Sequence, residues 1–315
     1  MSFLIGALLV ALSQDAAAVG PSPTCPPEAR PPSPAQMEEG MKNARDRGFL
    51  WRATKDGLTA YLYGTIHVGR VEWMFPGPEL MRAVRASDVI ALELDVLDPA
   101  LARRLQQGMA LKPEHDLPKA LKERLRAQLK AACLPEELLV TMSPEMVATT
   151  ISVMSARREG FDPSYGIDMI YAGLARGQGK PVASLETPDL QLALLLGRTA
   201  ADVVAAVEAV LPELEKGKAS PLVARMAGIW ANSQLGELEN YEQWCECLDT
   251  PDEREMMKRL LDERNPGLAR NIDALHAEGK RVFAAVGSLH MVGPLGLPAL
   301  LRERGYKVER VDFRP

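Results

Sequence analysis

The chain has 315 residues, of which 47% are hydrophobic and 25% are charged, a composition typical of a soluble globular protein with a sizeable core. Its formal net charge of −5, without any long Lys/Arg block, disfavours binding to nucleic acid or to anionic lipid. Length alone allows one large domain or two ordinary ones.

The beginning of the chain resembles an export signal. Residues 3–12 are apolar but too few to span a bilayer comfortably, and Ala16-Ala17-Ala18 follows as a small-residue cleavage pattern. We therefore expect a signal peptide over residues 1–18 and a periplasmic or secreted protein, with no stable membrane span after cleavage. Met1-Ser2 lacks the usual positive charge, which leaves an uncleaved N-terminal anchor as the alternative.

Residues 19–44 are rich in proline, which predicts a disordered linker. The four cysteines of the chain allow three connectivities if they are oxidised. The favoured expectation is a bridge from Cys133 to Cys245 or Cys247. A metal site at the Cys-x-Cys pair is a weaker alternative, because no second Cys/His pair lies nearby.

Residues 45–315 are expected to form the folded domain, beginning with strands and a helix. Two apolar runs, 49–54 and 58–63, flank Asp56-Gly57, which predicts a β-hairpin. A helix is expected over about 78–86 and a buried strand over 88–95. This order is typical of an α/β layer.

The middle of the chain has helical periodicity, and strands return towards its end. A helical insertion is expected over about 99–160, a helix from 165, a strand over 181–186, and further helices over about 188–279. A strand at 281–286, a helix at about 294–304 and a strand at 307–311 close the chain. The predicted fold class is mixed α/β, also describable as α+β, with a central mixed sheet and a large helical middle.

Two copies of a Gly-x-x-His motif each follow an apolar predicted strand. The first ends at His67 and the second at His290. A glycine at a strand end permits a sharp turn, so each histidine is expected to face the crevice at the carboxyl end of the sheet. Two histidines presented in the same way suggest one shared site. The other two, His115 and His276, lie in a polar loop and on a charged helix and are expected to be solvated.

Two glutamates also end predicted strands and could converge with the histidines. Glu93 closes the strand over 88–95 and Glu186 the strand over 181–186. Two histidines and a glutamate with an open coordination position are typical of a hydrolytic metal site, although residue type alone does not choose among Zn, Mn, Fe and Co. The second carboxylate is then a candidate general base or a support for the ligands.

Several of these residues also have ordinary structural interpretations. Asp95 shares the face of Glu93 and competes with it, whereas Glu186 and Asp168 could be a helix cap and a first-turn acid. Arg264-Asn265 lies at a helix junction, where arginine could clamp a substrate carboxylate or pair with a neighbouring acid. Ser288 beside His290 leaves open a Ser/His hydrolase as the lesser enzyme alternative.

The ordered set of motifs resembles the TraB/GumN family, which includes the animal Tiki proteases. The resemblance covers about residues 45 to 313 and rests on Leu62-Tyr63-Gly64-Thr65-Ile66-His67-Val68-Gly69, Leu92-Glu93-Leu94-Asp95, Gly166-Ile167-Asp168, Leu185-Glu186-Thr187, Glu263-Arg264-Asn265 and Ala285-Val286-Gly287-Ser288-Leu289-His290. It implies a fold akin to that of erythromycin-esterase-like and ChaN-like proteins.

The resemblance also implies an activity. Tiki members are divalent-metal-dependent proteases supported by Mn or Co, so it implies a peptide or protein substrate and Mn or Co as cofactor, with Zn possible. Carried over residue by residue, it assigns His67, Glu93 and His290 to the metal and catalytic set, supported by Glu186, Arg264, Asn265 and Asp168. The alternative is a protein that binds a peptide or haem in the same crevice without catalysis.

Overall fold

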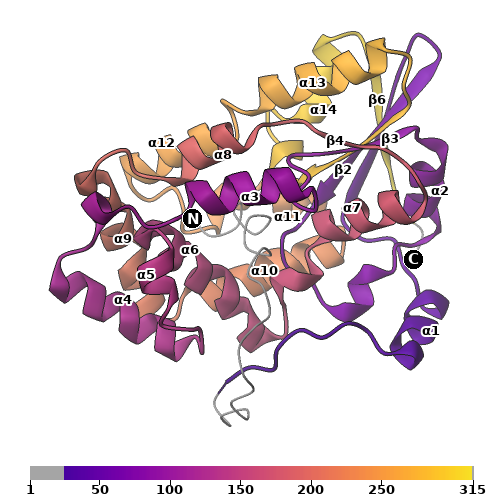
Figure 1. Cartoon of the computed structure of the whole chain (residues 1–315). Helices are drawn as coiled ribbons and strands as arrows, with labels where there is room; N and C mark the ends of the chain where they lie inside the picture. Colours follow the sequence, from indigo (N-terminus) through magenta and orange to yellow (C-terminus); the bar gives the residue numbers. More distant parts are fainter. Residues whose placement is uncertain (1–24, 314–315) are drawn as a thin grey trace.

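The computed structural model describes residues 25–313, and in it six strands form one mixed sheet in the order β4-β3-β5-β2-β1-β6 (Figure 1). The strands are β1 (Phe49–Lys55), β2 (Leu58–Thr65), β3 (Val89–Leu92), β4 (Val182–Ser184), β5 (Val282–Gly287) and β6 (Lys307–Val311). Adjacent strands among β4, β3, β5 and β2 run parallel, whereas β1 is antiparallel to both of its neighbours. The predicted mixed α/β class is confirmed. The expected signal peptide over residues 1–18 lies outside the described residues.

The predicted hairpin is formed by β1 and β2. Asp56 and Gly57 join them, with φ angles of 51° and 77°. Positive φ at both central residues is the backbone of a two-residue hairpin turn whose twist matches that of the strands. The turn pairs Lys55 with Leu58 and so fixes the register that carries β2 towards His67.

Helices cover the sheet and form most of the rest of the molecule. They are α1 (Pro34–Lys42), α2 (Pro78–Ala86), α3 (Pro99–Gly108), α4 (Lys119–Ala131), α5 (Leu138–Thr141), α6 (Pro144–Met154), α7 (Ile167–Gly177), α8 (Pro188–Leu195), α9 (Ala200–Glu215), α10 (Ala219–Ala231), α11 (Leu235–Glu239), α12 (Pro251–Leu260), α13 (Asn265–Ala277) and α14 (Leu297–Glu303). Helices α13 and α14 lie on one side of the sheet and α7 on the other (Figure 1).

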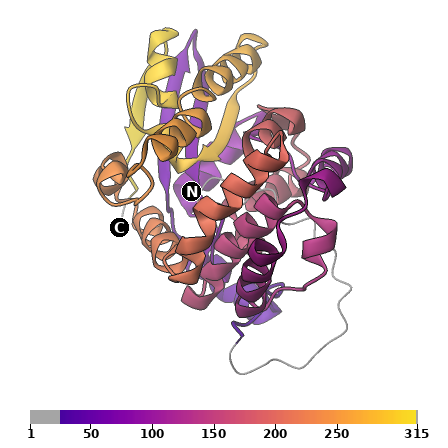
Figure 2. The same ribbon diagram turned by 90° about the vertical axis from the view of Figure 1, so that its left-hand side faces the viewer.

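Two hydrophobic cores divide the described part of the chain. The larger contains the strands together with apolar side chains of α7, α10, α12, α13 and α14. The second is built only from helical and loop segments and includes Leu121, Leu125 and Leu129, the predicted apolar stripe of α4. Figure 2 shows these helices to one side of the sheet. The boundary between the two cores is therefore a seam between the sheet-containing part and the helical part.

The predicted linker over residues 19–44 is wrong for its described part, which is ordered. Helix α1 forms there, with Ser33 and Gln36 in a capping box and a proline at its start. Before it, the Tyr165 hydroxyl accepts from the Arg30 N–H and donates to the Arg30 carbonyl, at 2.9 and 2.7 Å. Prolines in this segment start a helix or extend the chain along the surface, so a proline-rich composition did not prevent order.

The predicted bridge from Cys133 to Cys245 or Cys247 is also wrong. Cys25 is bonded to Cys133, with Cα atoms 5.8 Å apart, and Cys245 is bonded to Cys247, with Cα atoms 5.1 Å apart. Cys245 and Cys247 are buried in the sheet-containing core, whereas Cys133 follows α4 in the helical part. Between the two close cysteines, Glu246 has a φ of 48°, which folds the chain back on itself.

The two histidines expected to be solvated are instead buried. His115 is packed in a short 3-10 turn, and His276 lies edge-on to the Tyr306 ring with the ring centroids 4.9 Å apart. His276 is on the face of α13 that packs inward. The charged residues next to it in the sequence therefore did not indicate that its side chain is buried. In residues 25–313, every helix is too short or too polar to cross a bilayer.

Candidate active site

Four neighbouring parallel strands bring the predicted site residues to one edge of the sheet. Glu186 follows β4, Glu93 follows β3, His290 follows β5 in a 3-10 turn, and His67 follows β2. Because the strands are parallel, their carboxyl ends meet at the same edge, as in other open α/β sheets. The predicted convergence of these side chains is therefore present in the structure.

Arg264, at the start of α13, lies at the centre of this cluster. Its Nε and Nη2 donate to the two carboxylate oxygens of Glu186, at 2.8 and 2.6 Å. Nη2 also donates to Oε2 of Glu93, and Nη1 donates to the Leu260 carbonyl at 3.0 Å. The guanidinium is buried and holds two carboxylates from adjacent strands in fixed positions. Of the two interpretations left open, pairing with neighbouring acids is the one present.

His290 is completely buried, and its hydrogen bonds define its tautomer. Arg264 can only donate, so the 3.2 Å contact from its Nη1 makes Nε2 of His290 an acceptor. Nδ1 then carries the proton and donates to Oδ1 of Asn265, whose Nδ2 donates to the Leu295 carbonyl at 2.8 Å. Burial and the charge of Arg264 lower the pKa of His290 to about 3, so it is neutral at neutral pH.

His67 is arranged differently, and one of its nitrogens is left without a partner. Its Nδ1 lies 2.6 Å from Oδ2 of Asp168, and Oδ1 of Asp168 accepts from the hydroxyl of Thr65. Nε2 is buried and makes no hydrogen bond to any described residue. Burial alone would lower the pKa of His67, but the adjacent Asp168 carboxylate outweighs it and raises this pKa above its ordinary value. The pair is a histidine oriented by a carboxylate with its second nitrogen directed into the site.

Gly287 lies close to the side chains of Glu93, His290 and His67. Its N–H donates to Oε1 of Glu93 at 2.8 Å. A Cβ atom at this position would lie 3.2 Å from Oε1 of Glu93, 3.5 Å from Cδ2 of His290 and 3.9 Å from Nε2 of His67. The second Gly-x-x-His motif therefore favours glycine for space, because a Cβ here would crowd Oε1 of Glu93 and would also contact both histidines at ordinary van der Waals distances.

Replacing Gly287 by alanine is expected to lower the free energy of unfolding by about 1–3 kcal/mol, the cost of overpacking a filled site. Glu93 is held by Arg264 and by the Gly287 N–H, so it cannot move aside freely. Gly173→Ala on the exposed face of α7 is the matched control, because a Cβ there meets nothing within 4 Å. It is expected to stabilise the helix by up to about 1 kcal/mol. Urea denaturation measures both, and equal stability of Gly287→Ala and the unmodified chain would contradict this explanation.

The electrostatics of the cluster favour the ionised form of Glu93. Burial by itself would raise the pKa of Glu93, but the charge of Arg264 and the hydrogen bond from Gly287 help to lower it to about 2. Glu93, Glu186 and Asp168 supply three carboxylates against the single guanidinium of Arg264, so the formal charge is −2 when all three are ionised and His67 is neutral. The buried site therefore attracts a further positive charge.

The predicted metal set of His67, Glu93 and His290 does not fit a metal ion as these residues are placed. Arg264 occupies Oε2 of Glu93 and Nε2 of His290, two of the atoms that would bind the ion. Within residues 25–313, no three His, Cys, Asp or Glu side chains are grouped closely enough to hold a metal together. The positively charged guanidinium of Arg264 occupies the position between Glu93 and His290 that a metal cation would take.

The weaker sequence candidates have structural roles outside the hydrogen-bond network around Arg264. Asp95 pairs with Arg176 at 2.7 Å, and Ser288 donates to the Thr65 carbonyl at 2.7 Å instead of approaching His290. The Ser/His alternative is therefore wrong. Thr65, which sequence reasoning missed, supports Asp168; its place two residues before His67 within the motif was the available signal.

A small cavity lies beside His67. It has a volume of about 20 Å³ and is lined by Thr65, Ile66, His67, Met226, Trp230, Gly287, Ser288 and Leu289. This volume suffices for about one water molecule. Met226 and Trp230 belong to α10, so that helix covers the cavity on one side.

Comparison with known proteins gives one family and two distant relatives. The sequence model described as "TraB/PrgY/gumN family" matches residues 49–310, which include all the site residues above. Two proteins named "Uncharacterized protein YbaP", from Shigella flexneri and from Escherichia coli (strain K12), are each 25% identical over 275 residues, covering 82% of this chain and 95% of theirs. No solved structure matches the chain.

Proposed function

The chain belongs to the TraB/PrgY/gumN family, and we propose that it is an exported peptidase in which His67, oriented by Asp168, activates a water molecule. The observation that carries the proposal is the buried, unpartnered Nε2 of His67, together with a cavity the size of one water molecule that His67 helps to line. Export and a peptide substrate are supported by the apolar N-terminal stretch and by the resemblance of the motifs to the Tiki proteases.

The proposed step is general-base hydrolysis. Nε2 of His67 takes a proton from the water, whose oxygen bonds to the carbonyl carbon of the substrate, and the C–N bond then breaks as the amine nitrogen receives that proton. Asp168 keeps Nδ1 protonated and therefore keeps the lone pair on Nε2. Arg264, which also pairs with Glu186, fixes Glu93, and Glu93 in turn accepts from the Gly287 N–H. His290 is fixed between Arg264 and Asn265.

A divalent metal is the second candidate, favoured by the formal charge of −2 and by the free Nε2 of His67. Binding of Mn, Co or Zn by His67, Glu93 and His290 requires Arg264 to leave Glu93 and His290. Haem is disfavoured at these histidines, because a cavity of about 20 Å³ is far below the roughly 300–1,000 Å³ of cofactor and ligand pockets.

The test is cleavage of a pool of internally quenched fluorescent peptides by the protein purified without a His tag. One sample is assayed after EDTA treatment and dialysis, a second after addition of Mn or Co, and bound metal is measured in both by plasma mass spectrometry. We expect cleavage in the EDTA-treated, metal-free sample. Cleavage only in the metal-loaded sample would replace His67 base catalysis with the metal candidate. No cleavage in either sample would overturn the peptidase proposal and favour a binding protein.

A further inference from the structure

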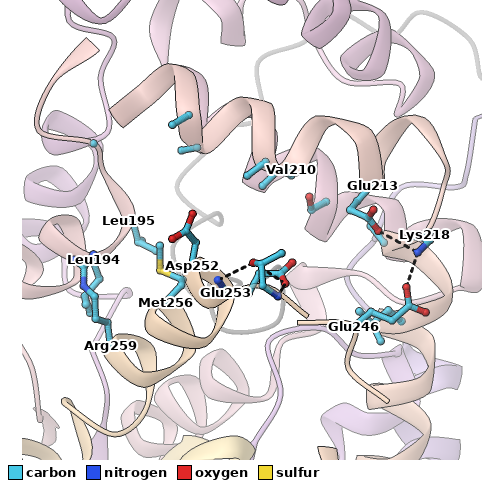
Figure 3. A pocket seen from close by; sticks show the side chains of 18 of the residues that line it. Leu194, Leu195, Val210, Glu213, Lys218, Glu246, Asp252, Glu253, Met256 and Arg259 are labelled. Carbon is cyan, nitrogen blue, oxygen red and sulfur yellow. Dashed lines mark hydrogen bonds and ion pairs between the residues drawn. The ribbon is translucent and has the colours of Figure 1, made fainter. Parts of the chain in front are cut away.

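A second, much larger cavity lies between helices α8, α9, α10 and α12, with a volume of about 1260 Å³ (Figure 3). Its walls are mostly apolar and include Leu194, Leu195, Val210, Leu222 and Met256. Ala205 and Ala209 of α9 line it and are exposed, so it opens to solvent. It is therefore an open cleft between helices and not a void in the packed interior.

The cavity follows the seam between the two hydrophobic cores. Leu194, Leu222 and Met256 pack on the sheet-containing core, whereas Leu195 and Val210 pack on the helical core. Clefts between two packed bodies are common positions for ligand sites. At 1260 Å³ the cavity exceeds the usual range for small ligands, which favours a longer occupant such as several residues of a peptide.

The charges around the cavity are of both signs and differ between its ends. At one end Lys218 lies 3.7 Å from Glu213 and 2.6 Å from Glu246. Arg259 is labelled at the other end in Figure 3, and it forms no ion pair with any residue in 25–313. A mixed rim is unsuited to a polyanion. The guanidinium groups of Arg259 and Arg198 both line the cavity and form no ion pair with a residue in 25–313, and a single such group is suited to one carboxylate.

Three helices connect this cavity to the candidate active site. Helix α8 starts two residues after Glu186, and α12 ends four residues before Arg264. Helix α10 lines both cavities: Leu222 faces the large one and Met226 the small one beside His67. Four helical residues rise about 6 Å, so along α10 the two cavities are one turn apart.

We propose that the large cavity binds an apolar segment of a peptide, with a carboxylate of that peptide at Arg259. The proposal rests on the proposed function for the cleavage step after binding, since α10 lines both this cavity and the small one beside His67. The apolar walls bury leucine-like side chains, and the open side along α9 admits a chain longer than the cavity.

The test measures peptide binding without cleavage, in the full chain carrying His67→Gln. Two dansyl-labelled nonapeptides are compared, one built from leucine, valine and alanine with an aspartate at its carboxyl end, the other from serine, glutamine and glycine. Ala206→Trp fills the cavity from α9, and Ala209→Glu places a charge in its wall. Ala120→Trp, on an exposed position of α4 outside the cavity, is the matched control. Thermal unfolding checks that each variant folds.

The apolar peptide is expected to bind at least tenfold more tightly than the polar one. Ala206→Trp and Ala209→Glu are each expected to weaken its binding at least tenfold, whereas Ala120→Trp leaves it unchanged. Equal binding of the two peptides, or undiminished binding to both cavity variants, would overturn the inference. If the apolar peptide binds in the cavity but chains with His67 intact cleave nothing, the proposed function fails and the binding site stands. If the cavity variants cleave peptides with the same KM as the unmodified chain, the binding site fails and the proposed function stands.

Discussion

Replacing His67 by glutamine is expected to reduce peptide cleavage by about 10²–10⁴-fold, the usual contribution of a general base. The glutamine amide reaches the position of Nε2 but has no basic nitrogen, and its flexible side chain can still turn to donate to Asp168. The free energy of unfolding is therefore expected to change by no more than about 1 kcal/mol. The measurement is kcat/KM on the peptides found by the cleavage screen, together with a urea denaturation curve.

His276→Gln is the matched control for this change. His276 is also buried, and its Nε2 also makes no hydrogen bond to a described residue, but it packs against Tyr306 on the α13 side of the sheet. Its substitution is expected to leave kcat/KM unchanged. A His67→Gln variant that retains more than a tenth of the activity, roughly 1.4 kcal/mol of barrier, would remove His67 from the role of base.

Asp168→Asn tests the role of the carboxylate that orients His67. The asparagine amide can donate to Nδ1 of His67, which transfers the imidazole proton to Nε2 and removes the lone pair from the site. We expect kcat to fall with little change in KM, because the defect lies in proton transfer and not in binding. A fall confined to KM would indicate that Asp168 only shapes the crevice.

The largest expected loss of stability follows from replacing Arg264 by methionine. The change leaves the buried carboxylates of Glu93 and Glu186 without their shared cation, and breaking a buried ion pair by removing one partner costs about 3–5 kcal/mol. Urea denaturation at pH 7 measures the loss. The loss is expected to become smaller as the pH falls towards 4, because Arg264 helps to hold the pKa of Glu93 at about 2. Without Arg264 a buried Glu93 binds a proton at a higher pH than in the unfolded chain, so acid stabilises the folded variant relative to its unfolded state.

Arg281→Met is the control for this prediction. Arg281 makes two contacts with Asp88, like those of Arg264 with Glu186, but both side chains are substantially exposed. Removal of this surface pair is expected to cost about 1 kcal/mol or less. A second test adds Glu93→Gln and Glu186→Gln to Arg264→Met. Because neutral amides need no counter-charge, the triple variant is expected to recover part of the lost stability. Equal losses for Arg264→Met and Arg281→Met would show that the buried network contributes nothing beyond a surface pair.

The sequence by itself determined the strands and the positions of the residues that come after them. The apolar runs before His67 and His290, and those ending at Glu93 and Glu186, became four adjacent parallel strands, β2, β5, β3 and β4. Alternation, turn residues and helix starts are properties of a few consecutive residues, so they can be recognised locally. Because parallel strands share one carboxyl edge, the convergence of these side chains followed from the order of elements.

Only the tertiary structure decided which atoms of the cluster contact one another. Arg264 lies 171 residues from Glu93 in sequence, and nothing local indicates that its guanidinium would fill the space between Glu93 and His290 that the predicted metal required. The disulfide of Cys25 with Cys133 and the burial of His276 also result from contacts between distant segments. Contacts between distant segments depend on how whole helices pack on the sheet, and a short sequence window carries no information about that packing.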